Sequence, residues 1–230
     1  MTEITTIGLP TNINLQLEII SDYKLYSAPN AFQIILMEQP IINYKHWMQN
    51  GRLLNLHENQ IAWPNNPYQY VFGDRIVSSC MLHSFSGSRI KPLNFVGYKP
   101  LDKLSGQHIN KNSSHCGDSL EDGVAENYGI TTTKLIVKAE LRFFQINEDV
   151  EMEVLDGSIN SDRIPSHEIQ SIMSIIHKRT TLDFFALDCL YDGSYWYLSD
   201  LNTFPGTSDN EICKKIAMYI KQIVDRREDV

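Results

Sequence analysis

The chain has 230 residues, of which 42% are hydrophobic and 21% are charged, which is the balance of a folded globular protein. Its length suits either one large α/β unit or two compact lobes that share a cleft. The formal net charge of -8 argues against a protein that coats nucleic acid, because coating needs a concentrated basic surface. The sequence shows no signal peptide and no run approaching the roughly 20 apolar residues that span a bilayer. We therefore expect a cytoplasmic protein with no nucleic-acid or membrane partner, and we leave a homodimer open.

The cysteines and histidines do not have the spacing of a zinc site. The four cysteines form no CxxC pair, so we expect reduced thiols, most of them packed in the interior. The seven histidines contain neither HExxH nor His-x-His. The sequence also lacks the Gly-x-Ser-x-Gly of a nucleophile elbow, a P-loop and a Rossmann fingerprint.

The first part of the chain contains one clear strand signal. Residues 31–38 (AFQIILME) form an apolar run stopped by Pro40, which predicts a buried strand. Residues 42–48 fit either a helix or a loop. Residues 63–67 (WPNNP) are rich in turn formers. We place a boundary close to this break, between an N-terminal α/β region, residues 1–70, and a second domain, residues 71–230.

The middle of the chain alternates between regular and irregular segments. Apolar residues recur at helical spacing over residues 74–84, and residues 95–99 read as a strand. The polar, glycine-containing residues 101–117 show no convincing element and predict a mobile loop.

The last part is the most regular. Residues 134–146 and 150–155 predict two antiparallel strands with a turn at residues 147–149. Residues 167–177 and 211–226 carry apolar side chains on one face and predict helices. Residues 184–190 and 195–201, joined by Asp192-Gly193-Ser194, predict a hairpin.

Three oxygen-bearing side chains converge in this hairpin. Asp188 lies in its first strand, and Asp200 and Asn202 lie two residues apart in its second strand, so they share a face. Magnesium is a hard cation that binds carboxylate and amide oxygens together with phosphates. By spacing alone, two acids that merely face solvent are an equally good interpretation.

The order of residue types favours the metal site. The hairpin reads LDFFALD, then DG, then WYLSDLNTFPG over residues 182–206. This string closely resembles the ATP-grasp pattern, in which an apolar strand ends in an acid and a second strand closes with Glu-x-Asn-x-x-Pro-Gly. Asp200 stands where that pattern has glutamate, which keeps the charge but shortens the side chain by one methylene.

Four weaker upstream matches occur in the order of the family. Residues 72–75 (FGDR) resemble the Asp-Lys that opens a helix before the nucleotide lobe, and residues 96–100 (VGYKP) resemble the strand whose lysine, here Lys99, contacts ATP phosphate. Residues 104–109 (LSGQHI) resemble the glycine-containing loop over the phosphates, with Ser105 and Gly106. Residues 139–144 (AELRFF) resemble a Glu-x-Arg strand, with Glu140 and Arg142.

The resemblance implies an α+β ATP-grasp fold, with two lobes that clamp the nucleotide and a short N-terminal α/β region. It implies ATP and Mg2+ as cofactors and a ligase that joins a small-molecule or peptide carboxylate to an amine through an acyl phosphate. The implied metal ligands are Asp188, Asp200 and Asn202. The implied nucleotide contacts are Lys99, Ser105, Gly106, Glu140 and Arg142, and Lys99 and Arg142 are the implied catalytic residues.

Two other interpretations remain open. The chain could be a non-catalytic ATP-grasp-like module that binds a nucleotide or a partner protein, or an α+β interaction domain with an accidental match. Magnesium-dependent ATP binding separates the last interpretation from the others, and ADP release separates the first two.

Overall fold

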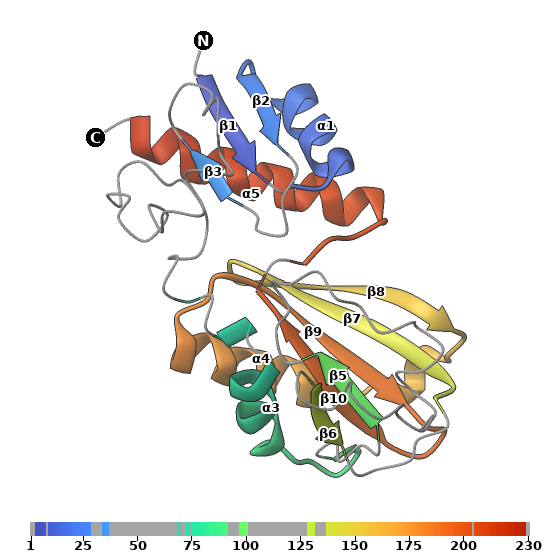
Figure 1. Cartoon of the computed structure of the whole chain (residues 1–230). Helices are drawn as coiled ribbons and strands as arrows, with labels where there is room; N and C mark the ends of the chain where they lie inside the picture. Colours follow the sequence, from blue (N-terminus) through green and yellow to red (C-terminus); the bar gives the residue numbers. More distant parts are fainter. Residues whose placement is uncertain are drawn as a thin grey trace.

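A computed structural model describes residues 3–7, 9–28, 34–36, 69, 72–73, 75–91, 97–100, 128–131, 137–203 and 205–228. Figure 1 shows a small sheet with two helices in the upper half of the view and a larger sheet with further helices below it. The observed elements mix helices with largely antiparallel strands, so the predicted α+β class is confirmed.

The upper half begins with a strand, a helix and a strand. β1 (Glu3–Ile7) and β2 (Lys24–Ala28) run parallel and are joined by α1 (Thr11–Ile20). β3 (Ile34–Leu36) lies on the other side of β1 and runs antiparallel to it. The predicted strand at residues 31–38 contains β3, whereas the sequence did not reveal β1, α1 or β2.

The last helix of the chain completes this half. α5 (Asn210–Glu228) packs beside α1, and Ile13 and Leu17 of α1 share a buried core with Ile216 and Ile220 of α5. Phe144 of the large sheet belongs to the same core. The two ends of the described chain therefore pack together on one face of the large sheet.

The large sheet has the strand order β4-β10-β9-β7-β8. Its strands are β4 (Ile90–Lys91), β7 (Ala139–Ile146), β8 (Asp149–Gly157), β9 (Phe184–Tyr191) and β10 (Trp196–Asn202). β4 pairs in parallel with β10, and the other neighbours are antiparallel. α3 (Arg75–His83) and α4 (Ser166–Thr180) contribute to a second core on the face opposite α5. β5 (Gly97–Pro100) and β6 (Tyr128–Thr131) form a separate antiparallel pair.

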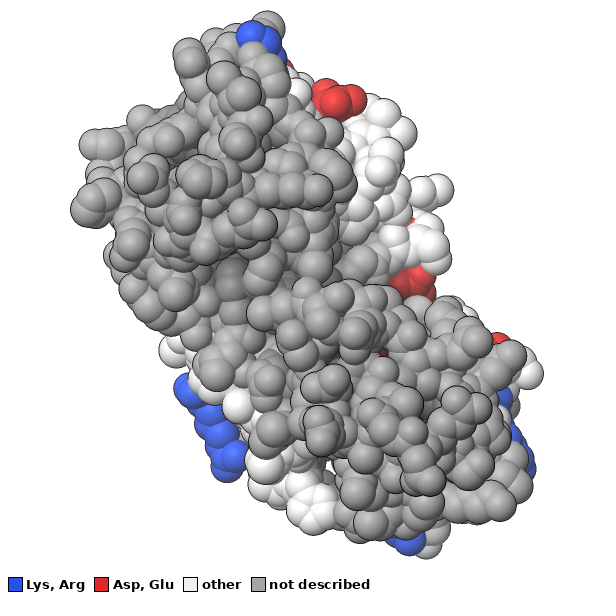
Figure 2. Space-filling model, viewed as in Figure 1, with Lys and Arg blue, Asp and Glu red and all other residues white. Residues whose placement is uncertain are grey.

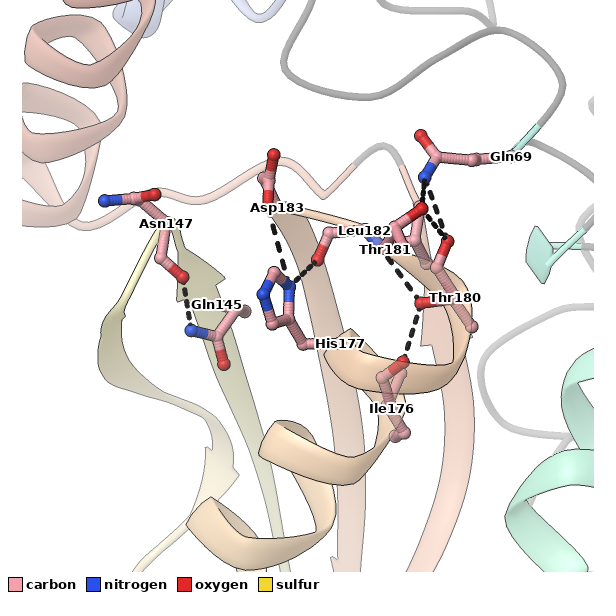
Figure 3. Close-up of polar contacts among 9 residues, drawn as sticks. All are labelled: Gln69, Gln145, Asn147, Ile176, His177, Thr180, Thr181, Leu182 and Asp183. Carbon is pink, nitrogen blue, oxygen red and sulfur yellow. Dashed lines mark hydrogen bonds and ion pairs between the residues drawn. The ribbon is translucent and has the colours of Figure 1, made fainter.

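Polar contacts fix the junction between α4 and β9 (Figure 3). His177 Nδ1 lies 2.8 Å from the carbonyl oxygen of Leu182 and 3.5 Å from a carboxylate oxygen of Asp183. Gln69 donates from Nε2 to the carbonyl oxygen of Thr180 at 2.9 Å. The end of α4 is thereby tied both to the start of the next strand and to a residue more than a hundred positions earlier in the chain.

The regular elements predicted in the last part of the chain are confirmed. Both hairpins, β7–β8 and β9–β10, and both helices, α4 and α5, occur where the patterns place them, although β7 begins only at Ala139 and residues 137–138, predicted as strand, are not part of it. α3 and β5 likewise match the predictions for residues 74–84 and 95–99. The segments 42–48, 63–67 and 101–117 lie outside the described residues, so the predictions made for them stay predictions.

Three of the cysteines lie in the described part of the chain as free thiols: Cys189 and Cys213 are buried, and Cys80 is exposed. On the face shown in Figure 2, the visible Lys and Arg side chains of the described residues lie apart and do not form one continuous patch. None of the helices in the described ranges is long and apolar enough to cross a membrane.

Candidate active site

The strands β7 and β9 each present alternate side chains to two different layers. Phe143 and Leu187 face the core under α4, while Phe144 and Ala186 face the core under α5. Because side chains alternate along a strand, the face that carries Phe144 and Ala186 also carries Arg142 and Asp188. The apolar contact with α5 therefore continues along the sheet into a polar strip.

Strand register places four charged residues side by side on this strip. Asp200 of β10 lies directly opposite Asp188 of β9, Asp188 lies opposite Arg142 of β7, and Arg142 lies opposite Glu153 of β8. Directly opposite residues in antiparallel strands share a face and lie close together. We call these four residues the charged row.

The centre of the charged row is a bidentate ion pair. Arg142 Nε donates to Asp188 Oδ1 at 2.6 Å, and Arg142 Nη2 donates to Asp188 Oδ2 at 2.8 Å. The side chains retain only 18% and 10% of their exposure. Burial lowers the pKa of Arg142, but the hydrogen bonds and the charge of Asp188, together with Glu153 and Glu140, outweigh it and raise that pKa. Arg142 is therefore a permanent cation within the row.

The segment after Asn202 crosses over the charged row on its way to α5. Arg142 Nη1 donates to the carbonyl oxygen of Gly206 at 3.0 Å. Glu153 is 8% exposed, and its carboxylate accepts from the hydroxyl groups of Thr207 and Ser208 at 2.8 and 2.7 Å, and from the backbone N–H of Ser208 at 3.1 Å. Side chains of β7 and β8 thus hold this segment against the large sheet.

The N-terminal half holds the same segment from the other side. Asn12 of α1 donates from Nδ2 to the carbonyl oxygen of Thr207 at 2.6 Å. A Cβ added at Gly206 would lie 3.5 Å from Pro10, which is ordinary van der Waals contact. The segment therefore lies between the large sheet and the start of α1.

A β-bulge turns the second pair of predicted ligands onto the polar strip. The register between β9 and β10 shifts between Leu198 and Asp200, which leaves Ser199 as the extra residue. Leu198 and Leu201 both face the core under α4. In a regular strand of the same sequence, Asp200 and Asn202 would share the face of Leu198, whereas the bulge places them beside Asp188 and Ala186.

Thr203, directly after Asn202, is closely packed. It is 1% exposed, and its Oγ1 has no hydrogen-bond partner in the described part of the structure. A Cβ added at Gly73 would lie 2.5 Å from this oxygen. Gly73, which has no side chain, thus allows the backbone before α3 to lie close to the end of β10.

The structure brings five of the predicted site residues onto one face. Arg142, Asp188 and Asp200 are directly opposite one another, Glu140 lies two residues along β7, and Asn202 lies two residues along β10. Lys99 lies in β5 opposite Gly129, but its side chain is not among those that the structure describes. Ser105 and Gly106 lie outside the described residues.

Sequence reasoning missed Glu153 and its partners Thr207 and Ser208. The only local signal is the alternation in β8, where Val150, Met152 and Val154 alternate with Glu151 and Glu153. This alternation places both acids on one face but does not show which of them meets residues more than fifty positions later.

Comparison with known proteins shows the fold but not a sequence family. No family model matches the chain, and no curated protein matches it. The macrocyclase MdnB from Microcystis aeruginosa MRC superimposes with a TM-score of 0.54 over 94% of this chain and 98% of its own, at 11% identity. The RiPP-associated ATP-grasp ligase from Chryseobacterium gregarium gives 0.53 over 98% and 97%, at 12% identity. D-alanine–D-alanine ligase from Bacillus anthracis gives 0.51 over 100% and 99%, at 9% identity.

The chain has the ATP-grasp fold. The likeness extends over nearly the whole chain, so the predicted ATP-grasp fold is confirmed. The hairpin β9–β10, whose sequence carries the resemblance, lies in the interior of the large sheet.

The ATP-grasp fold implies a magnesium ion with the nucleotide, and the polar strip offers a suitable set of oxygen ligands. Asp188, Asp200 and Asn202 supply only oxygen donors, which is the chemistry that magnesium prefers. Among the described residues, no group of three or more His, Cys, Asp or Glu side chains could hold a metal ion. Two carboxylates and an amide fit an ion that takes its remaining ligands from phosphates and water, as magnesium does in nucleotide sites.

Proposed function

We propose that this protein is an ATP-dependent carboxylate–amine ligase, which activates a carboxylate as an acyl phosphate for capture by an amine. The observation that carries this proposal is the polar strip on which Arg142 and Asp188 form a buried pair beside Asp200. A phosphoryl-transfer site needs oxygen ligands for a metal and a fixed cation close to them, and this strip supplies both.

The structural neighbours support both the nucleotide and a peptide substrate. The Chryseobacterium gregarium ligase was solved with ADP and with leader and core peptides, and the ATP-grasp ligase PsnB with a minimal precursor, Mg and ADP. The Bacillus anthracis D-alanine–D-alanine ligase was solved with ATP. We therefore propose ATP and Mg2+ as cofactors and peptide or amino-acid carboxylates as the substrate class.

Each residue of the site has a proposed role. Asp188, Asp200 and Asn202 would hold the magnesium ion, which neutralises phosphate charge when bound. Arg142 would donate hydrogen bonds to the transferring phosphoryl group, with Lys99 as a second cation. Ser105, Gly106 and Glu140 are the further proposed nucleotide contacts.

The reaction on this site transfers the γ-phosphoryl group to a carboxylate oxygen. The bond between the γ-phosphorus and the bridging oxygen breaks, the bond to the carboxylate oxygen forms, and ADP leaves. An amine then attacks the acyl carbon, phosphate leaves, and the amine loses one proton. Arg142 is held by Asp188 and by the carbonyl oxygen of Gly206, so its donors are oriented before substrate arrives.

ADP release and capture of the intermediate test this proposal. The protein is incubated with Mg-ATP, hydroxylamine and a panel of amino acids and short peptides, and both ADP and hydroxamate are measured. We expect a carboxylate that yields both, and neither product from the Asp188→Asn/Asp200→Asn variant. Magnesium-dependent ATP binding without ADP release for any candidate would instead favour the non-catalytic module.

A further inference from the structure

The carboxylate best placed to hold a metal ion is already bound to a cation. Both oxygens of Asp188 accept hydrogen bonds from the guanidinium group of Arg142, at 2.6 and 2.8 Å. Both side chains are largely buried. A divalent cation at Asp188 would therefore lie within a few ångströms of a fixed positive charge, in surroundings that screen charge less well than water does.

Several favourable contacts hold Arg142 in this position. Its third contact, to the carbonyl oxygen of Gly206, ties it to the segment above the row. Glu153 lies opposite it in the next strand and adds a favourable charge, as does Glu140. Moving the guanidinium away would leave Asp188 as a buried carboxylate with its main partner lost, which is costly.

Nucleotide phosphates would remove the conflict between the two cations. A guanidinium group carries five N–H donors, and Arg142 uses three of them toward the described residues. The other two N–H donors remain available for a phosphate that binds beside the pair with Asp188. The negative charge of the phosphates then offsets the repulsion between the guanidinium group and the metal ion.

We propose that Arg142 weakens metal binding at Asp188 until a nucleotide arrives, so that the divalent cation enters this site together with the nucleotide and not before it. This inference rests on the proposed function, because it assumes that phosphates bind beside the charged row. Since binding energies are reciprocal, the metal ion and the nucleotide must each strengthen the binding of the other.

Manganese binding in the absence of nucleotide tests the proposal. Free Mn2+ is measured by electron paramagnetic resonance for the wild type and for Arg142→Met, with and without the nucleotide analogue AMPPNP. We expect the wild type to bind Mn2+ weakly alone and tightly with AMPPNP. Arg142→Met should bind Mn2+ alone more tightly, by on the order of tenfold, because the opposing charge is gone. The gain from AMPPNP should shrink in that variant.

Two further variants serve as controls for the loss of positive charge. Lys215→Met removes one positive charge from the Lys215–Glu151 ion pair, away from Asp188, and should bind Mn2+ as the wild type does. Arg142→Lys keeps the charge at Asp188 and should also leave nucleotide-free binding weak. Far-UV circular dichroism confirms that each variant is folded. If Arg142→Met does not fold, Arg142→Lys still tests the proposal. This variant keeps the positive charge, so tight Mn2+ binding by it in the absence of nucleotide would overturn the proposal.

The outcomes separate this inference from the proposed function. Unchanged or weaker Mn2+ binding by folded Arg142→Met would overturn the inference, and so would an equal gain in Lys215→Met. In both cases the AMPPNP-dependent binding of the wild type would leave the proposed function standing. A wild type whose Mn2+ binding does not respond to AMPPNP would overturn the proposed function, and the inference would fall with it.

Discussion

Glu153 is a buried carboxylate that joins two distant parts of the chain. Its three hydrogen bonds all go to Thr207 and Ser208, in the segment that leads from β10 to α5. Glu151, two residues earlier on the same face, instead makes an ion pair with Lys215, whose side chain is 47% exposed. The two glutamates therefore lie on the same face of β8 but differ in their burial and in their hydrogen-bond partners.

We expect Glu153→Ala to lower the free energy of unfolding by about 2 kcal/mol, because it leaves buried donors without an acceptor. Glu151→Ala should have a much smaller effect, since exposed ion pairs contribute little. Urea denaturation followed by fluorescence measures both. Equal losses in the two variants would show that the contacts of Glu153 do not hold the segment.

Tyr197 gives a prediction for alkaline pH. Burial, followed by its hydrogen bond to Asp192 at 3.0 Å, raises its pKa from the usual 10.0 to about 12. Below the pKa that Tyr197 has in the unfolded chain, its side chain is neutral in both the folded and the unfolded state, so it does not change the stability as pH varies. Between the two values the unfolded chain releases a proton that the folded chain keeps, so stability falls as pH rises.

Replacement of Tyr197 by phenylalanine should remove this contribution. The slope of unfolding free energy against pH in that window should be shallower by about 1.4 kcal/mol per pH unit in Tyr197→Phe than in the wild type. Tyr219, whose pKa is also raised by burial, contributes equally to both proteins. Parallel slopes for the two proteins would contradict the assignment.

The sequence predicted some site residues but not others, for physical reasons. Asp188, Asp200 and Asn202 could be predicted because a short hairpin fixes which of its own residues meet. Arg142 entered only through the family resemblance, since its pairing with Asp188 joins strands separated by α4. Glu153 could not be predicted, because its partners lie in an irregular segment whose path depends on the packed molecule.

At the scale of elements, the bulge in β10 determines which face Asp200 occupies. Trp196, Leu198 and Leu201 all face the core under α4, at spacings of two and then three residues. A regular strand keeps a spacing of two, so the change to three marks the extra residue. The sequence carries this signal, although the spacing of Asp200 and Asn202 alone does not reveal it.

We expect deletion of Ser199 to retain the thermal stabilisation by Mg-ATP, because Leu198 and Asp200 would then be adjacent and regular alternation would still place Asp200 and Asn202 on the polar strip. Ser199→Ala keeps the residue count and should retain the stabilisation. Differential scanning fluorimetry with and without Mg-ATP compares them. A deletion variant that folds but no longer responds to Mg-ATP would contradict this account of which face the ligands occupy.

The contact between Gly73 and Thr203 gives a second prediction at this scale. A Cβ at Gly73 would lie 2.5 Å from Oγ1 of the buried Thr203, so Gly73→Ala should cost about 1–3 kcal/mol of stability through overpacking. Gly87→Ala is the matched control, since the close contact of its Cβ would be with the carboxylate end of Glu168, a flexible side chain that can move aside, and Ile90 would lie at ordinary van der Waals distance. Chemical denaturation should show a clear loss for the first variant and little for the second. A second substitution, Thr203→Ala, should recover part of the loss, and its failure to do so would contradict the steric explanation.

Long, locally periodic elements were predictable, whereas short elements that rely on distant partners were not. α4 and α5 show their buried faces in the sequence, and each hairpin closes through a short turn. β4 has two residues and pairs with β10, more than a hundred positions away. The α1 helix finds its main partner in α5 at the other end of the chain. No local pattern specifies such pairings.

At the scale of the whole molecule, the two halves meet at the candidate site. The core shared by α1, α5 and the large sheet ends where the charged row begins, and the segment before α5 is held by Asn12 from above and by Arg142 and Glu153 from below. Substrate groups bound on this strip would therefore contact a surface built from both halves. Lys99, Ser105 and Gly106 stay predictions, as does the division at residue 70.

Calorimetric titration with AMPPNP tests the central claim most directly, that the hairpin β9–β10 holds a magnesium–nucleotide complex. We predict saturable binding by the wild type in the presence of magnesium and much weaker binding after EDTA is added. The Asp188→Asn/Asp200→Asn variant should be folded and should bind weakly under both conditions, because it lacks the charged metal ligands. Equal, magnesium-independent affinity in the wild type and in this variant would contradict the account.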